Sequence, residues 1–191
     1  MENVQISLEF TPNPNTLKFV VSTRFMERGA ANFLSINEAQ GKSPLAESLF
    51  KVPGVSAVMI GPNFITITKA VDGDWDVVAE QVPQTIEKHL QSSSPVFSPD
   101  FNPAGPSTIS SNPEDQEIEK KIREILDNEI RPAVAMDGGD ITFGKYENGV
   151  VYLSLQGACS SCPSSTATLK IGVETRIKEL IPEVKEVVQY S

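Results

Sequence analysis

The chain has 191 residues, of which 39% are hydrophobic and 21% charged, and its net charge is −9. This composition is typical of a folded globular protein rather than a disordered or fibrous one, and the length suffices for one medium domain or two small ones. Residues 1–92 hold 7 basic and 10 acidic groups, and residues 113–191 hold 9 and 14. Because both halves are acidic, neither offers the basic face that nucleic-acid binding needs.

The first ten residues, MENVQISLEF, include two acidic residues and no Lys or Arg. This pattern fits neither a secretory signal nor an Arg-rich transit peptide. The chain also lacks an apolar run of about 18 residues, the minimum for a helix that spans a bilayer. We therefore expect a cytoplasmic protein with no membrane partner, in a compartment that keeps thiols reduced.

Residues 1–91 are expected to form a small α+β domain with a mostly antiparallel sheet. Alternating apolar residues predict its strands, and longer periods predict its helices; the strands lie at 4–10, 16–22, 55–61 and 64–70, and the helices at 43–50 and 75–91. Pro83 should kink or split the second helix. His89 is the chain's one histidine, and near a helix end it is expected to be a polar surface residue.

Residues 92–113 have the composition of a flexible linker. These 22 residues include seven Ser, five Pro and one Gly, with no periodic apolar pattern. Such a segment cannot bury enough surface to offset the entropy of ordering it. Docking of the isolated Val96, Phe97 and Phe101 on a domain surface is the alternative.

Residues 114–191 predict a second α+β domain with the order α-β-β-α-β. Asn112 and Pro113 suit the start of its first helix, which Pro132 should end or bend. The later elements are strands at 141–147 and 150–156, a helix at 166–180 and a strand at 184–190. The whole chain thus predicts two small α/β-sandwich-like domains joined by a Ser/Pro-rich linker.

Two short sequences in this second domain predict turns. Asn148-Gly149 is a strong signal for a two-residue hairpin between the first two strands. Asp137-Gly138-Gly139-Asp140 has paired glycines that tolerate a positive φ, and we interpret it as a turn rather than a metal or phosphate loop.

Cys159 and Cys162 are the chain's two cysteines, and they lie in GACSSCPSS at 157–165. Cysteines spaced C-x-x-C in a tight loop can direct both sulfurs at one centre, and thiolates are preferred ligands of iron–sulfur clusters and of zinc. The same spacing also suits a dithiol redox pair, so spacing alone does not separate a metal site from a thiol–disulfide oxidoreductase.

The number of ligands constrains a metal site further. Cubane clusters and structural zinc sites commonly take four protein ligands, whereas this chain offers two cysteines. Either two chains contribute two thiolates each, as a symmetric dimer allows, or the pair is not a complete metal site. A zinc-bridged dimer stays open, and so does the oxidoreductase, although the thioredoxin-like βαβ pattern is missing around the pair.

The sequence around the cysteines resembles a known family. IRPAVAMDGGDI (130–141) and GACSSCPSSTATLKIGVETRIKELIPEV (157–184) are similar to the NifU C-terminal-like, or Nfu-type, iron–sulfur carrier domain. TPNPNTLKF (11–19), PLAESLFKVPGV (44–55) and Trp75-Asp76 resemble the N-terminal domain that accompanies it. Together the two resemblances cover nearly all of the chain outside the linker.

The resemblance implies a [4Fe–4S] cluster that Cys159 and Cys162 of two protomers hold between them. It further implies a homodimer that receives the cluster from upstream assembly proteins and delivers it to apo iron–sulfur proteins. A carrier of this kind is not an enzyme, and no residue is predicted to be catalytic. Delivery is favoured over primary assembly, because no cysteines match the assembly or ferredoxin-type domains of longer family members.

Overall fold

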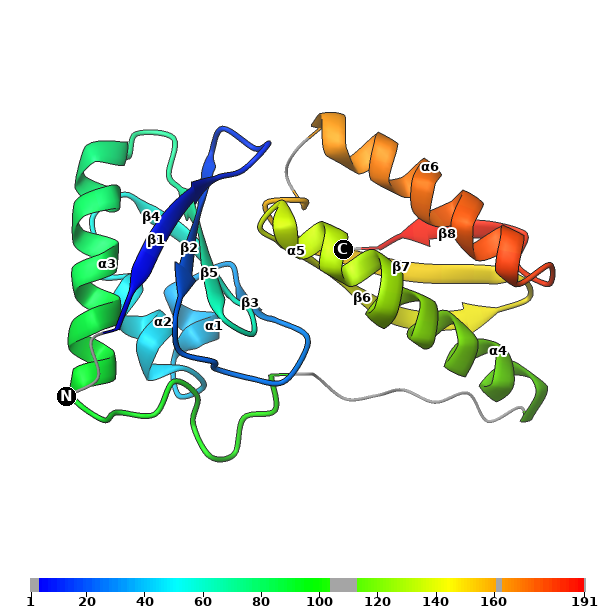
Figure 1. The fold of residues 1–191 in the computed structure, drawn as a ribbon, viewed down its shortest axis with the longest axis horizontal. Helices are drawn as coiled ribbons and strands as arrows, with labels where there is room; N and C mark the ends of the chain where they lie inside the picture. Colours follow the sequence, from blue (N-terminus) through cyan, green and yellow to red (C-terminus); the bar gives the residue numbers. More distant parts are fainter. Residues whose placement is uncertain (1–3, 104–112, 161–162, 191) are drawn as a thin grey trace. The chain divides into compact units, whose positions relative to one another are not determined.

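The computed structural model describes residues 4–103, 113–160 and 163–190. Contacts divide the chain into two compact units, residues 1–105 and 106–191 (Figure 1). Each unit combines one sheet with helices, which confirms the predicted α+β class. Within the described ranges, no helix has the length and apolar character needed to cross a membrane.

The N-terminal unit is built on an antiparallel sheet of five strands in the order β1-β2-β5-β4-β3. Its elements are β1 (Ile6–Phe10), β2 (Thr16–Val21), β3 (Ala31–Phe33), α1 (Ile36–Ala39), α2 (Pro44–Leu49), β4 (Val55–Ile60), β5 (Phe64–Lys69) and α3 (Trp75–Gln91). The four predicted strands and both predicted helices are present. No periodic pattern predicts β3 or α1, because three or four residues are too few to display a period.

One face of this sheet packs against α2 and α3. Alternate residues of β2, β4 and β5 point to that face, as the strand period requires, and they form the core with both helices: Leu17, Phe19, Val21, Val58, Ile60, Ile65, Ile67, Leu45, Leu49, Val78, Val82 and Ile86. Pro83 lies inside α3 without splitting it. The packed residues Val82 and Ile86 flank Pro83, and tertiary packing of this kind outweighs the loss of one helical hydrogen bond.

The segment 94–103 differs from the flexible linker expected there, because it packs on the N-terminal unit. The Ser43 hydroxyl donates to the Val96 carbonyl over 2.7 Å, and the Ser98 amide donates to the Lys42 carbonyl over 2.8 Å. The Phe101 ring lies 5.9 Å from that of Phe33. The structure therefore confirms the alternative, in which Val96, Phe97 and Phe101 dock on the surface of a domain.

His89 was expected on the surface, but its residue exposure is 8%. Its Nε2 lies 3.1 Å from the carbonyl oxygen of Pro95, in the docked segment. This contact could not be predicted, because the Ser- and Pro-rich composition of segment 94–103 indicates a flexible linker. Hydrogen bonds with the N-terminal unit nevertheless hold the segment in place.

The C-terminal unit has a sheet of three strands in the order β6-β7-β8, with β6 and β7 antiparallel and β7 and β8 parallel. Its elements are α4 (Pro113–Ile125), the π-helical turn η1 (Leu126–Ile130), α5 (Arg131–Met136), β6 (Gly139–Glu147), β7 (Val150–Gly157), α6 (Pro163–Leu180) and β8 (Glu186–Gln189). This confirms the order α-β-β-α-β. Asn148 and Gly149 have φ angles of 53° and 87°, as the predicted hairpin turn requires.

Pro132 does not end the first helix, but the helix is irregular just before it. The helix passes through the π-turn η1 and continues as α5, with Pro132 in the first turn of α5. A proline inside an α-helix clashes with the carbonyl four residues earlier, and a π-turn widens the helix at that point.

Helices α4 and α6 pack on the same face of this sheet (Figure 1). Its core joins residues from α4 and η1, from alternate positions of β6 and β7, and from α6: Ile122, Ile125, Leu126, Ile141, Val151, Leu153, Leu155, Val173 and Ile177. This core includes Cys159, so the packing of sheet and helices positions that residue after the end of β7.

Candidate functional site

The cysteine loop begins where β7 ends. Gly157 is the last residue of β7 and has a φ of 62°, which turns the chain out of the sheet. The amide and the hydroxyl of Ser160 both donate to the Gly157 carbonyl, over 3.2 and 2.8 Å. This tight turn contains Cys159, and α6 starts at Pro163. Cys162 lies outside the described residues, so its role as a ligand stays a prediction.

The Cys159 side chain is buried, with a residue exposure of 3%, and it belongs to the apolar core of the C-terminal unit. Its sulfur lies against the backbone of Gly139. A Cβ built on Gly139 would come within 2.5 Å of Cys159 Sγ and within 3.0 Å of the Gln156 carbonyl oxygen. Glycine alone fits at this position, because any other residue would displace the thiol or the neighbouring strand.

A turn is present at Asp137 and Gly138, within the predicted Asp137-Gly138-Gly139-Asp140 segment, and Gly139 directly after it starts β6. Asp137 caps α5, and Gly138 follows with a φ of 75°. The Gly138 amide donates to Ala135, and the Ala158 amide donates to the Gly138 carbonyl, each over 3.1 Å. The glycine turn therefore supports the cysteine loop directly, a role that the sequence did not reveal.

Arg131, in the first turn of α5, holds the other end of the glycine turn. Its Nε donates to the carboxylate of Asp140 over 2.8 Å, and its Nη2 donates to the Ile141 carbonyl over 2.8 Å. Its Nη1 donates to the carboxylate of Asp127 in η1. One guanidinium group thus ties η1, α5 and the start of β6 together.

Asp140 is buried, with an exposure of 2%. Burial raises the pKa of its carboxyl group above the usual 3.8, and the charge of Arg131 opposes this rise. Among the described residues, Asp140 Oδ2 and Gln156 Oε1 have no hydrogen-bond partner, although the two residues are paired across β6 and β7. The sequence offered one signal for this network, the acidic residues of the turn that follow an Arg in the preceding helix.

A complete metal site does not exist within one chain as far as the described residues go. They include no group of three or more His, Cys, Asp and Glu side chains placed to hold a metal ion. The chemistry available at the loop is that of the Cys159 thiol, surrounded by the small residues Gly157, Ala158 and Ser160. Soft thiolates with little bulk around them fit an iron–sulfur cluster.

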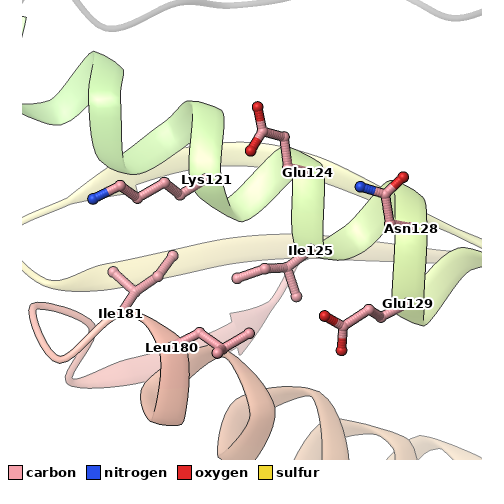
Figure 2. A pocket seen from close by; sticks show the side chains of 7 residues that line it. All are labelled: Lys121, Glu124, Ile125, Asn128, Glu129, Leu180 and Ile181. Carbon is pink, nitrogen blue, oxygen red and sulfur yellow. The ribbon is translucent and has the colours of Figure 1, made fainter.

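A pocket of about 280 Å³ opens elsewhere on this unit, between α4, η1 and the C-terminal end of α6 (Figure 2). Its lining is mixed apolar and charged: Lys121, Glu124, Ile125, Asn128, Glu129, Leu180 and Ile181. It contains no thiol, and it lies at the opposite end of α6 from the cysteine loop, about 27 Å away for a helix of 18 residues. We therefore place the functional site at the cysteine loop.

Both units match known families. Residues 6–93 match the family described as scaffold protein Nfu/NifU N terminal, and residues 122–188 match the NifU-like domain. A solution structure of a NifU-like protein from Saccharomyces cerevisiae is 29% identical, covering 51% of this chain and 87% of that protein with a TM-score of 0.43.

Full-length relatives match both units together. The human mitochondrial NFU1 iron–sulfur cluster scaffold homolog is 40% identical over 185 residues, which is 96% of this chain and 71% of the relative. The homolog from Drosophila ananassae is 42% identical, over 98% of this chain and 64% of the relative. The mitochondrial NifU-like protein 4 of Arabidopsis thaliana is 39% identical, over 96% and 65%. This chain thus spans roughly two thirds of the length of these relatives.

These names overturn the expected cytoplasmic location, because all three relatives are named as mitochondrial proteins. That expectation rested on the composition of the first ten residues.

The two domain matches cover both structural units in the same order along the chain, and the relatives match over nearly its whole length. The chain therefore belongs to the Nfu family, with an Nfu/NifU N-terminal domain followed by a NifU-like domain.

Proposed function

We propose that this protein is an iron–sulfur cluster scaffold and carrier. Cys159 and Cys162 bind the cluster, receive it from upstream assembly proteins and pass it to apo iron–sulfur proteins. The observation that supports this most is that a C-x-x-C pair forms the chain's full set of cysteines, and that Cys159 of this pair lies in the tight turn that follows β7. Relatives that share both domains are named iron–sulfur cluster scaffolds.

The cluster in this proposal is of the [4Fe–4S] type and is shared by a homodimer. A cubane cluster takes four cysteine thiolates, and each chain has two. A two-fold axis beside the cysteine loop would bring two equivalent pairs together. Dimerisation then depends on the cluster, and each chain supplies half of the site.

Holding the cluster with two thiolates from each chain also suits its transfer. The cluster is cargo, not a resident cofactor, and the thiolates of an acceptor can displace the carrier thiolates one at a time. Each step exchanges one iron–sulfur bond for another, so the cluster need not be released into solution. The protein requires no catalytic residue for this, and we propose no enzymatic activity.

Anaerobic reconstitution with iron and sulfide tests the proposal. About four irons and four sulfides should be bound per two chains, and Cys159→Ser or Cys162→Ser should each abolish retention of the cluster. A chain that binds zinc instead would be a structural zinc dimer. A chain that stays without metal, but traps a substrate as a mixed disulfide through Cys159 in the Cys162→Ser variant, would be an oxidoreductase.

The N-terminal domain serves partner recognition in this proposal. It contains no cysteine, and it has a hydrophobic core of its own, separate from the core beside the cysteine loop. A domain that supplies no thiolate and folds around its own core is suited to bind an assembly protein or an acceptor.

A further inference from the structure

The Cys159 sulfur is buried, although it is a proposed ligand of a cluster shared by two chains. A sulfur that binds a cluster shared by two chains must reach metal atoms outside its own chain. Cys159, however, is 3% exposed, and its sulfur lies against Gly139. In this structure the thiol of Cys159 therefore points into the core of the C-terminal unit and not toward a second chain.

Space for the thiol exists because Gly139 lacks a side chain. A Cβ at this position would lie 2.5 Å from Cys159 Sγ and 3.0 Å from Cys159 Cβ, far inside ordinary van der Waals distance. Gly138 has a positive φ, whereas Gly139 does not. The backbone conformation at Gly139 therefore does not itself require glycine, and the reason for glycine there is the close contact with Cys159 and with the Gln156 carbonyl.

Three sets of interactions hold Gly139 in place. It pairs with Gly157 across β6 and β7. The glycine turn before it bonds to Ala158, and Asp140 after it is fixed by the guanidinium of Arg131. Arg131 also donates to the carbonyl of Ile141, so the first residues of β6 cannot shift without breaking both bonds.

We propose that Gly139 and Arg131 are positioning residues that keep the Cys159 thiol sheltered until a cluster is loaded. Gly139 provides the space, and Arg131 fixes the strand that contains Gly139. Loading then requires Cys159 Sγ to leave Gly139 and turn outward. The inference rests on the proposed function only in taking Cys159 as a cluster ligand. The burial of its thiol is a property of the metal-free protein.

Alkylation of the metal-free, reduced full-length protein by iodoacetamide tests the sheltering, with each cysteine followed by site-resolved mass spectrometry. Cys159 should react at least about tenfold more slowly in the folded protein than in urea, because the thiol must first be exposed by opening. Gly139→Ala should raise the Cys159 rate about tenfold, because the added Cβ occupies the position of the sulfur. Gly172→Ala is the matched control, since a Cβ there meets no atom within 4 Å.

A second variant keeps the test valid if Gly139→Ala does not fold. Arg131→Lys adds no atom near the thiol, but it loses the forked contact with Asp140 and Ile141, and it should raise the Cys159 rate severalfold. The unfolding free energy of each variant, measured by urea titration, gives the alkylation rate of Cys159 expected from global unfolding alone. The measured increase in the Cys159 rate must exceed the increase expected on that basis. Equal Cys159 rates in folded and unfolded wild type, or unchanged rates in both variants, would overturn the inference. Because no iron is present, these results stand whether or not the protein then binds a cluster.

Discussion

Arg131 Nε lies 2.8 Å from Oδ1 of Asp140, the residue that follows Gly139. The side chain of Asp140 is 3% exposed and that of Arg131 is 19% exposed, so this ion pair is largely removed from water. It connects the helix that ends at the glycine turn with the strand that starts there. The fold beside the cysteine loop therefore depends on a charged pair as well as on apolar packing.

Arg131→Met should destabilise the C-terminal unit by about 3 kcal/mol, because it leaves the Asp140 carboxylate buried without its partner. Urea unfolding followed by circular dichroism measures the change. Arg176→Met is the control, since Arg176 pairs with Glu129 where both side chains are 42% exposed. Exposed pairs contribute little to stability, so a loss in the control as large as that in Arg131→Met would contradict the special role of the buried pair.

The Asp140 carboxyl group should also give stability a dependence on pH. Burial raises its pKa in the folded protein above the ordinary 3.8. A raised carboxyl pKa means that the folded state binds the proton more tightly than the unfolded chain does. The group's favourable contribution is therefore complete below about 3.8, and it is lost as pH rises through the folded-state pKa.

Comparison with Asp140→Asn isolates that contribution. The unfolding free energy of the wild type, minus that of Asp140→Asn, should fall as the pH is raised from the ordinary carboxyl pKa toward neutrality. Urea titrations at a series of pH values give this difference. If it rises with pH instead, attraction to Arg131 outweighs burial, and the pKa of Asp140 is lowered.

The docked segment 94–103 should contribute to the stability of the N-terminal unit. Phe101 has ring contacts with Phe33 at 5.9 Å and with Phe97 at 5.8 Å between centroids. Phe101→Ala should cost about 1–2 kcal/mol, as expected for a half-buried aromatic residue with such contacts. Phe10→Ala is the matched control, because Phe10 is 85% exposed. Equal effects of the two substitutions on thermal unfolding would indicate that the segment detaches in solution.

Much of the fold could be predicted from the sequence, because local patterns determine it. Alternation in β2, β4 and β5, the Asn148-Gly149 turn and the period of α6 all depend on residues close in the chain. The fate of the two helical prolines could not be predicted. Pro83 stays inside α3, where Val82 and Ile86 pack in the core, and Pro132 follows a π-turn whose Leu126 packs in the other core. Contacts of this kind join residues that are distant in the sequence, so no local pattern predicts them.

The sequence predicts which residues make up the candidate site, but it does not predict the structure around Cys159. The C-x-x-C spacing and the count of two cysteines predict the ligands of the proposed cluster, and this stays a prediction. Gly139 lies 20 residues before Cys159, and its contact with the thiol arises only when β6 pairs with β7. Likewise, burial of Asp140 and its contact with Arg131 depend on where α5 lies against β6, which no local pattern encodes.

Removal of the N-terminal unit should spare the cluster and weaken its delivery. The deletion should cover residues 1–105, because the segment 94–103 packs with that unit. Iron and sulfide per chain after reconstitution should match those of the full-length protein, whereas transfer to an apo iron–sulfur acceptor should be slower. Loss of the cluster on deletion would contradict a role limited to partner recognition, and unchanged transfer to every acceptor tested would contradict the role itself.

Native mass spectrometry of the anaerobically reconstituted protein tests the shared cluster most directly. The expected species is a dimer whose mass exceeds that of two chains by one [4Fe–4S] cluster, with no cluster on the monomer. Mixing wild type with Cys159→Ser before reconstitution should leave the mixed dimers without a stable cluster, because they supply three thiolates. A monomer that carries a complete cluster, or a dimer that carries two, would contradict a cluster shared between two chains.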